Sequence, residues 1–199
     1  MPNPPSVDPP PRTVVGPEAL VALAVPARFA ILDHLLTAGP RTASQCAEVV
    51  GVTPSNCSWH LRALAKVGLV EPAAPTTGDA RTRPWQATAA GFDFSGASGP
   101  AAEVAQTALA GMSAQQGNEL FNRYLDRQAQ VPDAWRQAAA VNSYALSLTA
   151  EELTSLVEAV DRLIRPYVRP LRQQAPEGSR TVNVTFRAFL NPDLGEAGS

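Results

Sequence analysis

The sequence is poor in cysteine, in lysine and in long apolar runs. Its 199 residues include only two cysteines, Cys46 and Cys57, too few for the disulfide framework of a small secreted domain. No stretch approaches the roughly 18 apolar residues that a membrane span requires. The N-terminus also lacks the charged and apolar regions of a secretory signal. We therefore expect a cytoplasmic protein without a membrane partner.

A strong net charge is absent too. Sixteen basic and eighteen acidic residues give a net charge of -2, so the net charge does not indicate a nucleic-acid partner. The charges are unevenly distributed, because residues 12–90 carry seven basic and five acidic side chains (+2), whereas residues 91–199 carry nine and twelve (-3). This asymmetry is compatible with electrostatic attraction at the N-terminal end only.

Prolines, glycines and apolar residues divide the chain into three parts. Six prolines among the first eleven residues predict a disordered, proline-rich tail over residues 1–15. Residues 16–95 carry closely spaced helix signals and a hairpin signal, which indicate one small domain. Residues 96–199 predict a mainly helical region that ends in a β-strand.

Helix signals are clearest in the second of these parts. A helix is expected over residues 26–38, between a proline at its start and Gly39. Thr42 and Gln45 have the spacing of a capping box for a second helix, and Gly51 is suited to end it. A third helix is expected to begin only three residues later, which is typical of a helix-turn-helix.

The third helix, over residues 54–66, has an apolar inner side and a polar outer side. It starts with Thr53 as N-cap and Pro54 at the first helical position. Helical spacing turns four side chains inward, namely Cys57, Leu61, Leu64 and Ala65. The outer side is suited to the major groove of DNA, where Ser and Asn contact bases or phosphates and cations neutralise phosphates. The simpler alternative is that these polar side chains only solvate an amphipathic helix.

A β-hairpin predicted over residues 69–87 favours the DNA-binding interpretation. The turn TTGD separates two short extended runs, and Pro72 and Pro84 place them at an exposed edge. Arginines on one side of this ribbon can reach the minor groove or the backbone. The predicted DNA-contacting residues of the helix and hairpin are Thr53, Ser55, Asn56, Ser58, Trp59, His60, Arg62, Lys66, Arg81 and Arg83.

Residues 18–95 resemble the winged helix-turn-helix of ArsR-like bacterial transcriptional regulators. The predicted hairpin over residues 69–87 corresponds to the wing in this resemblance. The resemblance is carried by Arg28 with Ile31 and Leu32, by the pattern S-x-x-S-x-H-L-x-x-L that starts at Ser55, by GLVE at the entry to the wing and by T-x-x-G after it. The RPW at residues 83–85 further resembles a subgroup common in actinobacteria. The resemblance implies dimeric binding of double-stranded DNA, usually repression, and often release by a bound signal.

The chain also departs from this family. Metal-sensing members share a pair of cysteines on the first helix of the motif, whereas Cys46 stands alone, so no metal or other cofactor is carried over. Trp59 replaces a polar or basic residue that is more usual at its position. Two alternatives for the cysteines are a redox-sensitive Cys46–Cys57 disulfide and a zinc site that adds His34 and His60.

An enzyme is not expected. The two histidines offer few nucleophile–base pairs, and neither G-x-S-x-G nor G-x-G-x-x-G occurs.

The C-terminal region predicts two helices and a strand. A long helix is expected over residues 97–130, in which Gly111 and Gly117 indicate a break or a close helix contact. Its candidate buried residues are Val104, Ala108, Met112, Leu120 and Tyr124. Thr149 and Glu152 form a capping box for a second helix, and residues 181–190 alternate as a half-buried strand without an evident partner.

Two roles are open for this region. The long helix could pair with its copy in a second subunit, and an unidentified small-molecule effector could bind near aromatic residues. Those candidate pocket residues, for which ordinary core packing is the default, are Trp135, Tyr144, Tyr167, Phe186 and Phe189.

The sequence therefore predicts a mainly α fold with a small β content: a winged helix-turn-helix followed by a helical C-terminal region ending in a strand. The expected function is sequence-specific DNA binding by a homodimeric transcriptional repressor. The alternative is a winged helix that serves as a protein-interaction module and binds no DNA.

Overall fold

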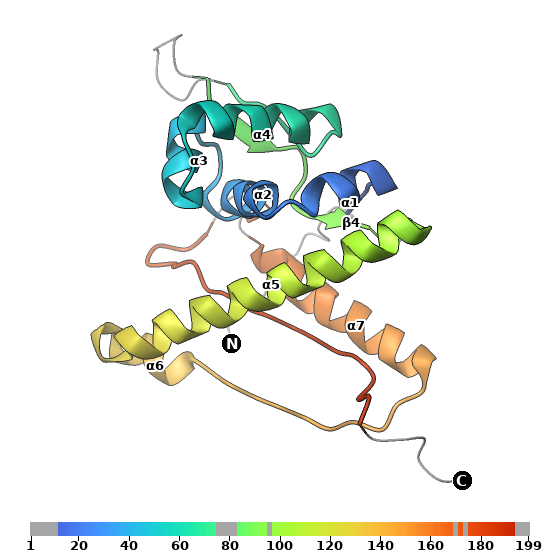
Figure 1. Cartoon of the computed structure of the whole chain (residues 1–199). Helices are drawn as coiled ribbons and strands as arrows, with labels where there is room; N and C mark the ends of the chain where they lie inside the picture. Colours follow the sequence, from blue (N-terminus) through green and yellow to red (C-terminus); the bar gives the residue numbers. More distant parts are fainter. Residues whose placement is uncertain (1–11, 75–82, 95–96, 169–170, 173–174, 194–199) are drawn as a thin grey trace.

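A computed structural model describes residues 12–74, 83–94, 97–168, 171–172 and 175–193, and its helices and short strands follow one another as shown in Figure 1. The elements of the N-terminal domain are β1 (Thr13–Val14), α1 (Pro17–Leu23), α2 (Pro26–Ala38), α3 (Ala43–Val50), α4 (Pro54–Lys66), β2 (Val70–Pro72), β3 (Trp85–Ala87) and β4 (Phe92–Asp93). Those of the C-terminal region are α5 (Pro100–Arg127), η1 (Gln128–Gln130), α6 (Asp133–Ala138), α7 (Ala150–Ile164) and η2 (Arg165–Tyr167).

Helices α2, α3 and α4 pack around one apolar core, as the sequence predicts. The capping box of Thr42 and Gln45 is present at the start of α3, and Gly51 ends it in the left-handed conformation, with φ 72° and ψ 32°. That glycine turns the chain sharply from α3 into α4. The side chains that are fully buried between the three helices include Ile31, Cys46, Cys57, Leu61 and Leu64.

The predicted hairpin is confirmed. Strands β2 and β3 are antiparallel, with Val70 opposite Ala87 and Pro72 opposite Trp85. Strand β3 is also bridged to Arg41 on its other side. The N–H of Arg41 donates to the carbonyl of Trp85 at 2.9 Å, and the N–H of Trp85 donates to the carbonyl of Arg41 at 2.7 Å. The hairpin is thereby fixed to the loop between α2 and α3. Residues 75–82, at its turn, lie outside the described part of the chain.

The N-terminal boundary differs from the prediction. Residues 1–11 of the expected tail lie outside the described residues, but Thr13 and Val14 form strand β1. This strand pairs in parallel with β4, in which Phe92 is buried. The partner strand β4 lies almost 80 residues away from β1 in the sequence, and no local sequence signal predicts this pairing. The expectation of disorder was therefore wrong for residues 12–15.

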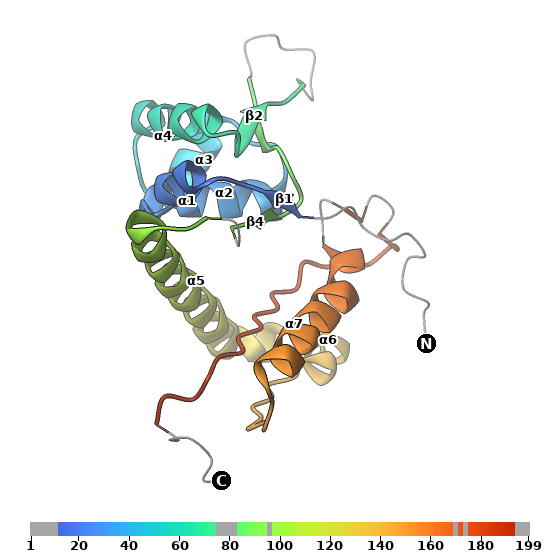
Figure 2. The same ribbon diagram turned by 90° about the vertical axis from the view of Figure 1, so that its right-hand side faces the viewer.

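Helix α5 is continuous over 28 residues and leads away from the N-terminal domain (Figure 2). Neither of its glycines breaks it. Val104, predicted to be buried, is 71% exposed, and the first turns instead bury Ala102 and Ala105 against Leu20 of α1. The small alanine side chains allow α1 to approach closely, which turns the larger valine outward. Farther along, Gln116 donates a 2.6 Å hydrogen bond to Asp33 of α2.

The C-terminal region has helices but no buried core in a single chain. The predicted capping box of Thr149 and Glu152 is present at the start of α7. However, no residue beyond Ala105 is buried within the described part of the chain. The predicted terminal strand was wrong, because residues 181–190 make no backbone hydrogen bond to another segment in the described part of the chain and form no strand. Alternation of apolar residues favours a strand, but only a neighbouring strand can complete one.

Among the described residues, none of the helices taken singly has the length and apolar composition of a membrane span. Helices α1 and α2 meet that test only when counted together, and they are bent by 101° at the break between them.

Both cysteines are free and buried. Burial raises the pKa of Cys46 to about 12 and also raises the pKa of Cys57. Because a thiolate is the reactive form, the Cys46 thiolate population at neutral pH should be roughly a thousandfold below that of an exposed thiol. We therefore expect iodoacetamide to label neither cysteine of the native protein at pH 7 on the timescale that labels both in guanidinium, as read by intact mass. Rapid labelling of the folded protein would contradict this burial.

Candidate nucleic-acid interface

Helix α4 is held so that one side faces the core and the other faces solvent. Its N-terminus is fixed by Thr53, whose Oγ1 accepts a hydrogen bond from the backbone N–H of Asn56 at 3.2 Å. Its inner side is anchored by the completely buried side chains of Cys57, Leu61 and Leu64. Because this seam leaves the helix no freedom to rotate, it determines which side chains point outward.

Most of the predicted contact residues lie on that outer side. Thr53, Ser55, Asn56, Trp59, Arg62 and Lys66 are all exposed. Ser58 is half-buried, and its hydroxyl donates a 2.9 Å hydrogen bond to the carbonyl of Pro54. Its oxygen can still accept a further hydrogen bond. The exposed face thus combines short polar side chains, one large aromatic ring and two cations.

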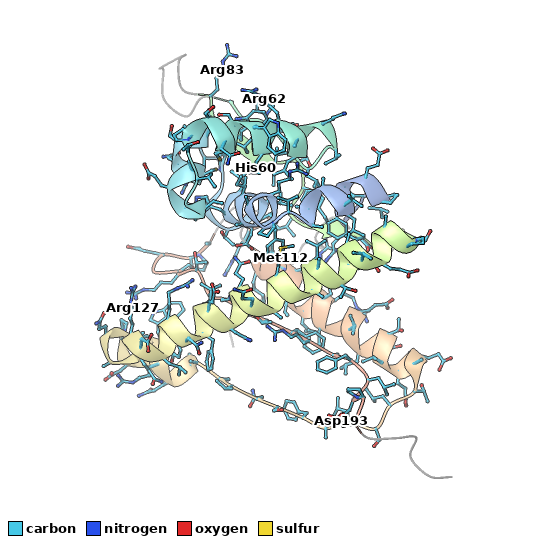
Figure 3. The ribbon with its side chains drawn as sticks, viewed as in Figure 1. His60, Arg62, Arg83, Met112, Arg127 and Asp193 are labelled. Atoms are coloured by element: carbon cyan, nitrogen blue, oxygen red, sulfur yellow. The ribbon has the colours of Figure 1, made fainter. Side chains whose placement is uncertain are left out.

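The positive charges of this face are unopposed on the helix itself. Helix α4 contains Arg62 and Lys66 and no carboxylate. On the wing, Arg83 is exposed, and Figure 3 shows it projecting on the same side of the molecule as Arg62. Arg81, the other predicted wing contact, lies outside the described residues.

His60 does not lie on the outer face, which corrects the prediction for this residue. Its side chain is only 7% exposed, and Figure 3 shows it below α4, toward the core. Its position, three residues after Cys57 and four before Leu64, places it within the buried arc of the helix. The edge of its ring meets Trp59, with ring centroids 5.0 Å apart and an interplanar angle of 71°. Its Nδ1 is buried and has no hydrogen-bond partner among the described residues.

Arg28 of α2 is a feature of the site that the sequence reasoning did not assign to it. Its guanidinium carbon lies 5.1 Å from the centroid of the Trp59 ring, a cation–π geometry, and its Nη1 donates to the carbonyl of Ala22 at 3.1 Å. Trp59 is 56% exposed, so Arg28 and His60 support the ring from within while the rest of it faces solvent. The available signal was that Arg28 is the only arginine or lysine of α2.

The alternative metal site and the candidate aromatic pocket are not assembled in the described residues. Within them, no group of three or more His, Cys, Asp or Glu side chains is placed to hold a metal ion. The aromatic residues that were candidates for an effector pocket do not come together either. Tyr144 and Phe189 are exposed, Trp135 lies under Arg180, and Tyr167 lies under Arg172. These rings belong to separate parts of the C-terminal region.

Comparison with known proteins identifies a domain in the first half of the chain. A family model described as a helix-turn-helix domain matches residues 23–73, from the end of α1 to just beyond β2. The chain therefore contains a helix-turn-helix domain, and the β2–β3 hairpin beside it forms its wing. No curated protein matches the sequence.

Two solved structures are similar to parts of the chain. One is the solution structure of Mb0332 from Mycobacterium bovis, described as a homodimeric winged helix-turn-helix DNA-binding domain (fragment 1-100) of a possible ArsR-family transcriptional regulator. It is 24% identical over 50% of this chain and 75% of that one, with a TM-score of 0.32. The other is the C30AH42A mutant of Lactococcus lactis ZitR in apo form, 18% identical over 69% of this chain and 83% of that one, also with a TM-score of 0.32.

The burial of His60 predicts a dependence of stability on pH. Desolvation, and then the charge of Arg28, lower the pKa of His60 below its ordinary 6.5. The unfolded chain therefore binds a proton more readily than the folded one, so stability is full above pH 6.5 and falls as the pH drops below it. We expect His60→Gln to lose less stability than the wild type between about pH 7 and pH 5, measured by urea unfolding.

His34 supplies the matched control, because burial and then the charge of Arg41 also lower its pKa. His34→Gln should retain the His60 contribution, and the double variant should show the weakest dependence on pH. An unchanged slope in His60→Gln would show that its protonation is not linked to folding.

Proposed function

We propose that this chain is a sequence-specific DNA-binding transcriptional regulator that acts as a homodimer. In this proposal α4 lies in the major groove and the wing formed by β2 and β3 follows the sugar–phosphate backbone. The observation that carries it is the outer face of α4, where polar, aromatic and cationic side chains are held outward by a completely buried seam. The helix-turn-helix match over residues 23–73 supports the same function.

The side chains suggest different roles along the helix. Ser55 and Asn56, in its first turn, can hydrogen-bond to base edges, as the N-terminal residues of recognition helices commonly do. Arg62 and Lys66, farther along, are suited to neutralise phosphates. The Trp59 ring is too large for bidentate base recognition, but its exposed part can cover a thymine methyl group or a sugar.

Repression is the direction of control that we propose, supported by the resemblance of residues 18–95 to the ArsR-like regulators. A dimer of winged helices would occupy two half-sites about one helical turn apart and exclude other proteins from that stretch of DNA.

One observation favours a second candidate, a protein-interaction module. Trp59 is 56% exposed, and tryptophan is enriched at the centres of protein–protein interfaces. The two functions differ in their response to salt, because only phosphate binding releases a large number of condensed counterions from DNA.

A titration of DNA binding against salt tests the proposed function. The purified full chain should first be used to select bound fragments from random DNA, which yields a binding sequence. On that sequence Arg62→Ala should weaken binding at low salt and lower the slope of log K against log salt by about 0.9, the value for one phosphate contact. Fluorescence anisotropy of labelled duplexes measures both quantities.

Arg127→Ala is the matched control, since it removes the same charge from the far end of α5, away from α4 (Figure 3). It should leave both the affinity and the salt slope at wild-type values. Equal effects of the two variants would contradict the placement of α4 on DNA. Failure to select any DNA, together with capture of a protein through Trp59, would favour the interaction module.

A further inference from the structure

The C-terminal half of the chain exposes an apolar surface that no described part of the same chain covers. Of the nineteen large apolar side chains exposed in the described residues, fifteen lie from Val104 onward. The apolar stripe of α7 is at best half-buried, and Val157 and Leu163 on that helix are exposed. A capped amphipathic helix of this kind normally buries its stripe, so the surface that should cover it is missing from the single chain.

Two polar side chains of residues 181–190, Thr185 and Arg187, lie against α5, whereas the valines of this segment are exposed to solvent. Arg187 donates a 2.9 Å hydrogen bond from Nη2 to the carbonyl of Ala114 on α5. Thr185 lies so close to the same helix that a Cβ on Gly117 would be 3.1 Å from its Oγ1. Successive residues of an extended segment point to opposite sides, so Val182 and Val184 face outward, 61% and 63% exposed. A subunit that remained alone would favour the opposite orientation.

Residues 140–148 form a second segment whose large apolar side chains are exposed. Tyr144, Leu146 and Leu148 alternate along an extended segment, and all three are exposed. No backbone hydrogen bond joins either segment to another segment in the described part of the chain. Figure 1 shows both without strand arrows, on either side of α7 in the sequence. The order of extended segment, helix and extended segment is that of a β–α–β unit whose sheet is not formed.

A second copy of the chain fits this surface. The exposed apolar side chains from Val104 onward lie on α5, α7, η2 and both extended segments, so two copies related by a twofold axis would bury equivalent apolar faces against each other. The interfaces of obligate homodimers are apolar in the same way.

We propose that residues 140–148 and 181–190 become strands of a β-sheet shared between two copies of this chain. Each copy contributes both segments, and the outward faces of Val182, Val184 and Phe186 meet the equivalent apolar surfaces of the other copy. Helices α5 and α7 then cover the shared sheet. The assembly rests on the homodimer of the proposed function, to which it adds the surface and the mode of pairing.

A pair of glutamate substitutions on opposite sides of one segment tests this pairing. Phe186 lies on the apolar side and Thr181 on the polar side, five residues away, where it is exposed. Phe186→Glu should weaken dimerisation roughly thirtyfold or more, because an aromatic anchor of the interface is replaced by a charge. Thr181→Glu should leave it close to the wild-type value. Analytical ultracentrifugation of the full chain measures the dimer dissociation constant, and hydrogen exchange reports on the two segments.

In the wild-type dimer the amides of both segments should exchange slowly, and Phe186→Glu should abolish that protection. Protection of α2 to α4 should remain, since the core of the N-terminal domain does not include Phe186; this shows that the variant is folded. A monomeric wild type, a dimer with unprotected segments, or protection that persists in a monomeric variant would each overturn the proposal. Binding of the selected DNA is measured separately, so a dimer that forms this sheet without binding DNA contradicts only the proposed function.

Discussion

The structure depends first on the burial of one seam of α4. Cys57, Leu61 and Leu64 are completely buried against α2 and α3, and this contact determines the rotation of the helix about its axis. The outward direction of Trp59 and Arg62 follows from that rotation. Arg28 and His60 extend the same contact to the edge of the core, where they support the tryptophan ring. Burial of the inner side of α4 thereby holds the side chains of its outer side in a position where a partner can contact them.

Features with local signals could be predicted from the sequence. The bounds of α4 follow from Thr53 and Pro54, and the start of α3 follows from the capping box of Thr42 and Gln45. The hairpin was predictable because its strands are neighbours in sequence. In contrast, β1 could not be predicted, because its partner β4 is distant in the sequence and both strands are only two residues long.

Side chains at the border of a buried face were harder to assign. The polarity of His60 predicts an outer position, although its spacing from Cys57 and Leu64 puts it on the inner arc of α4. The apolar character of Val104 predicts burial, but alanines allow the closer packing of α5 on α1. Residues 181–190 show a further limit: alternation describes a segment suited to a sheet, while the strand itself exists only where a neighbour supplies hydrogen bonds.

The two halves of the chain therefore differ in how they bury their apolar side chains. The N-terminal domain closes its own core, whereas the C-terminal region presents amphipathic elements that need a second surface. Helix α5 joins them, and its first half is attached to the N-terminal domain, because Ala102 and Ala105 pack on α1 and Gln116 donates a hydrogen bond to Asp33 of α2. In the proposed dimer, the distance between the two copies of α4 is thus determined by how the C-terminal regions pair. Any molecule that altered that pairing would change the spacing of the half-sites that the dimer can reach, without touching α4 itself.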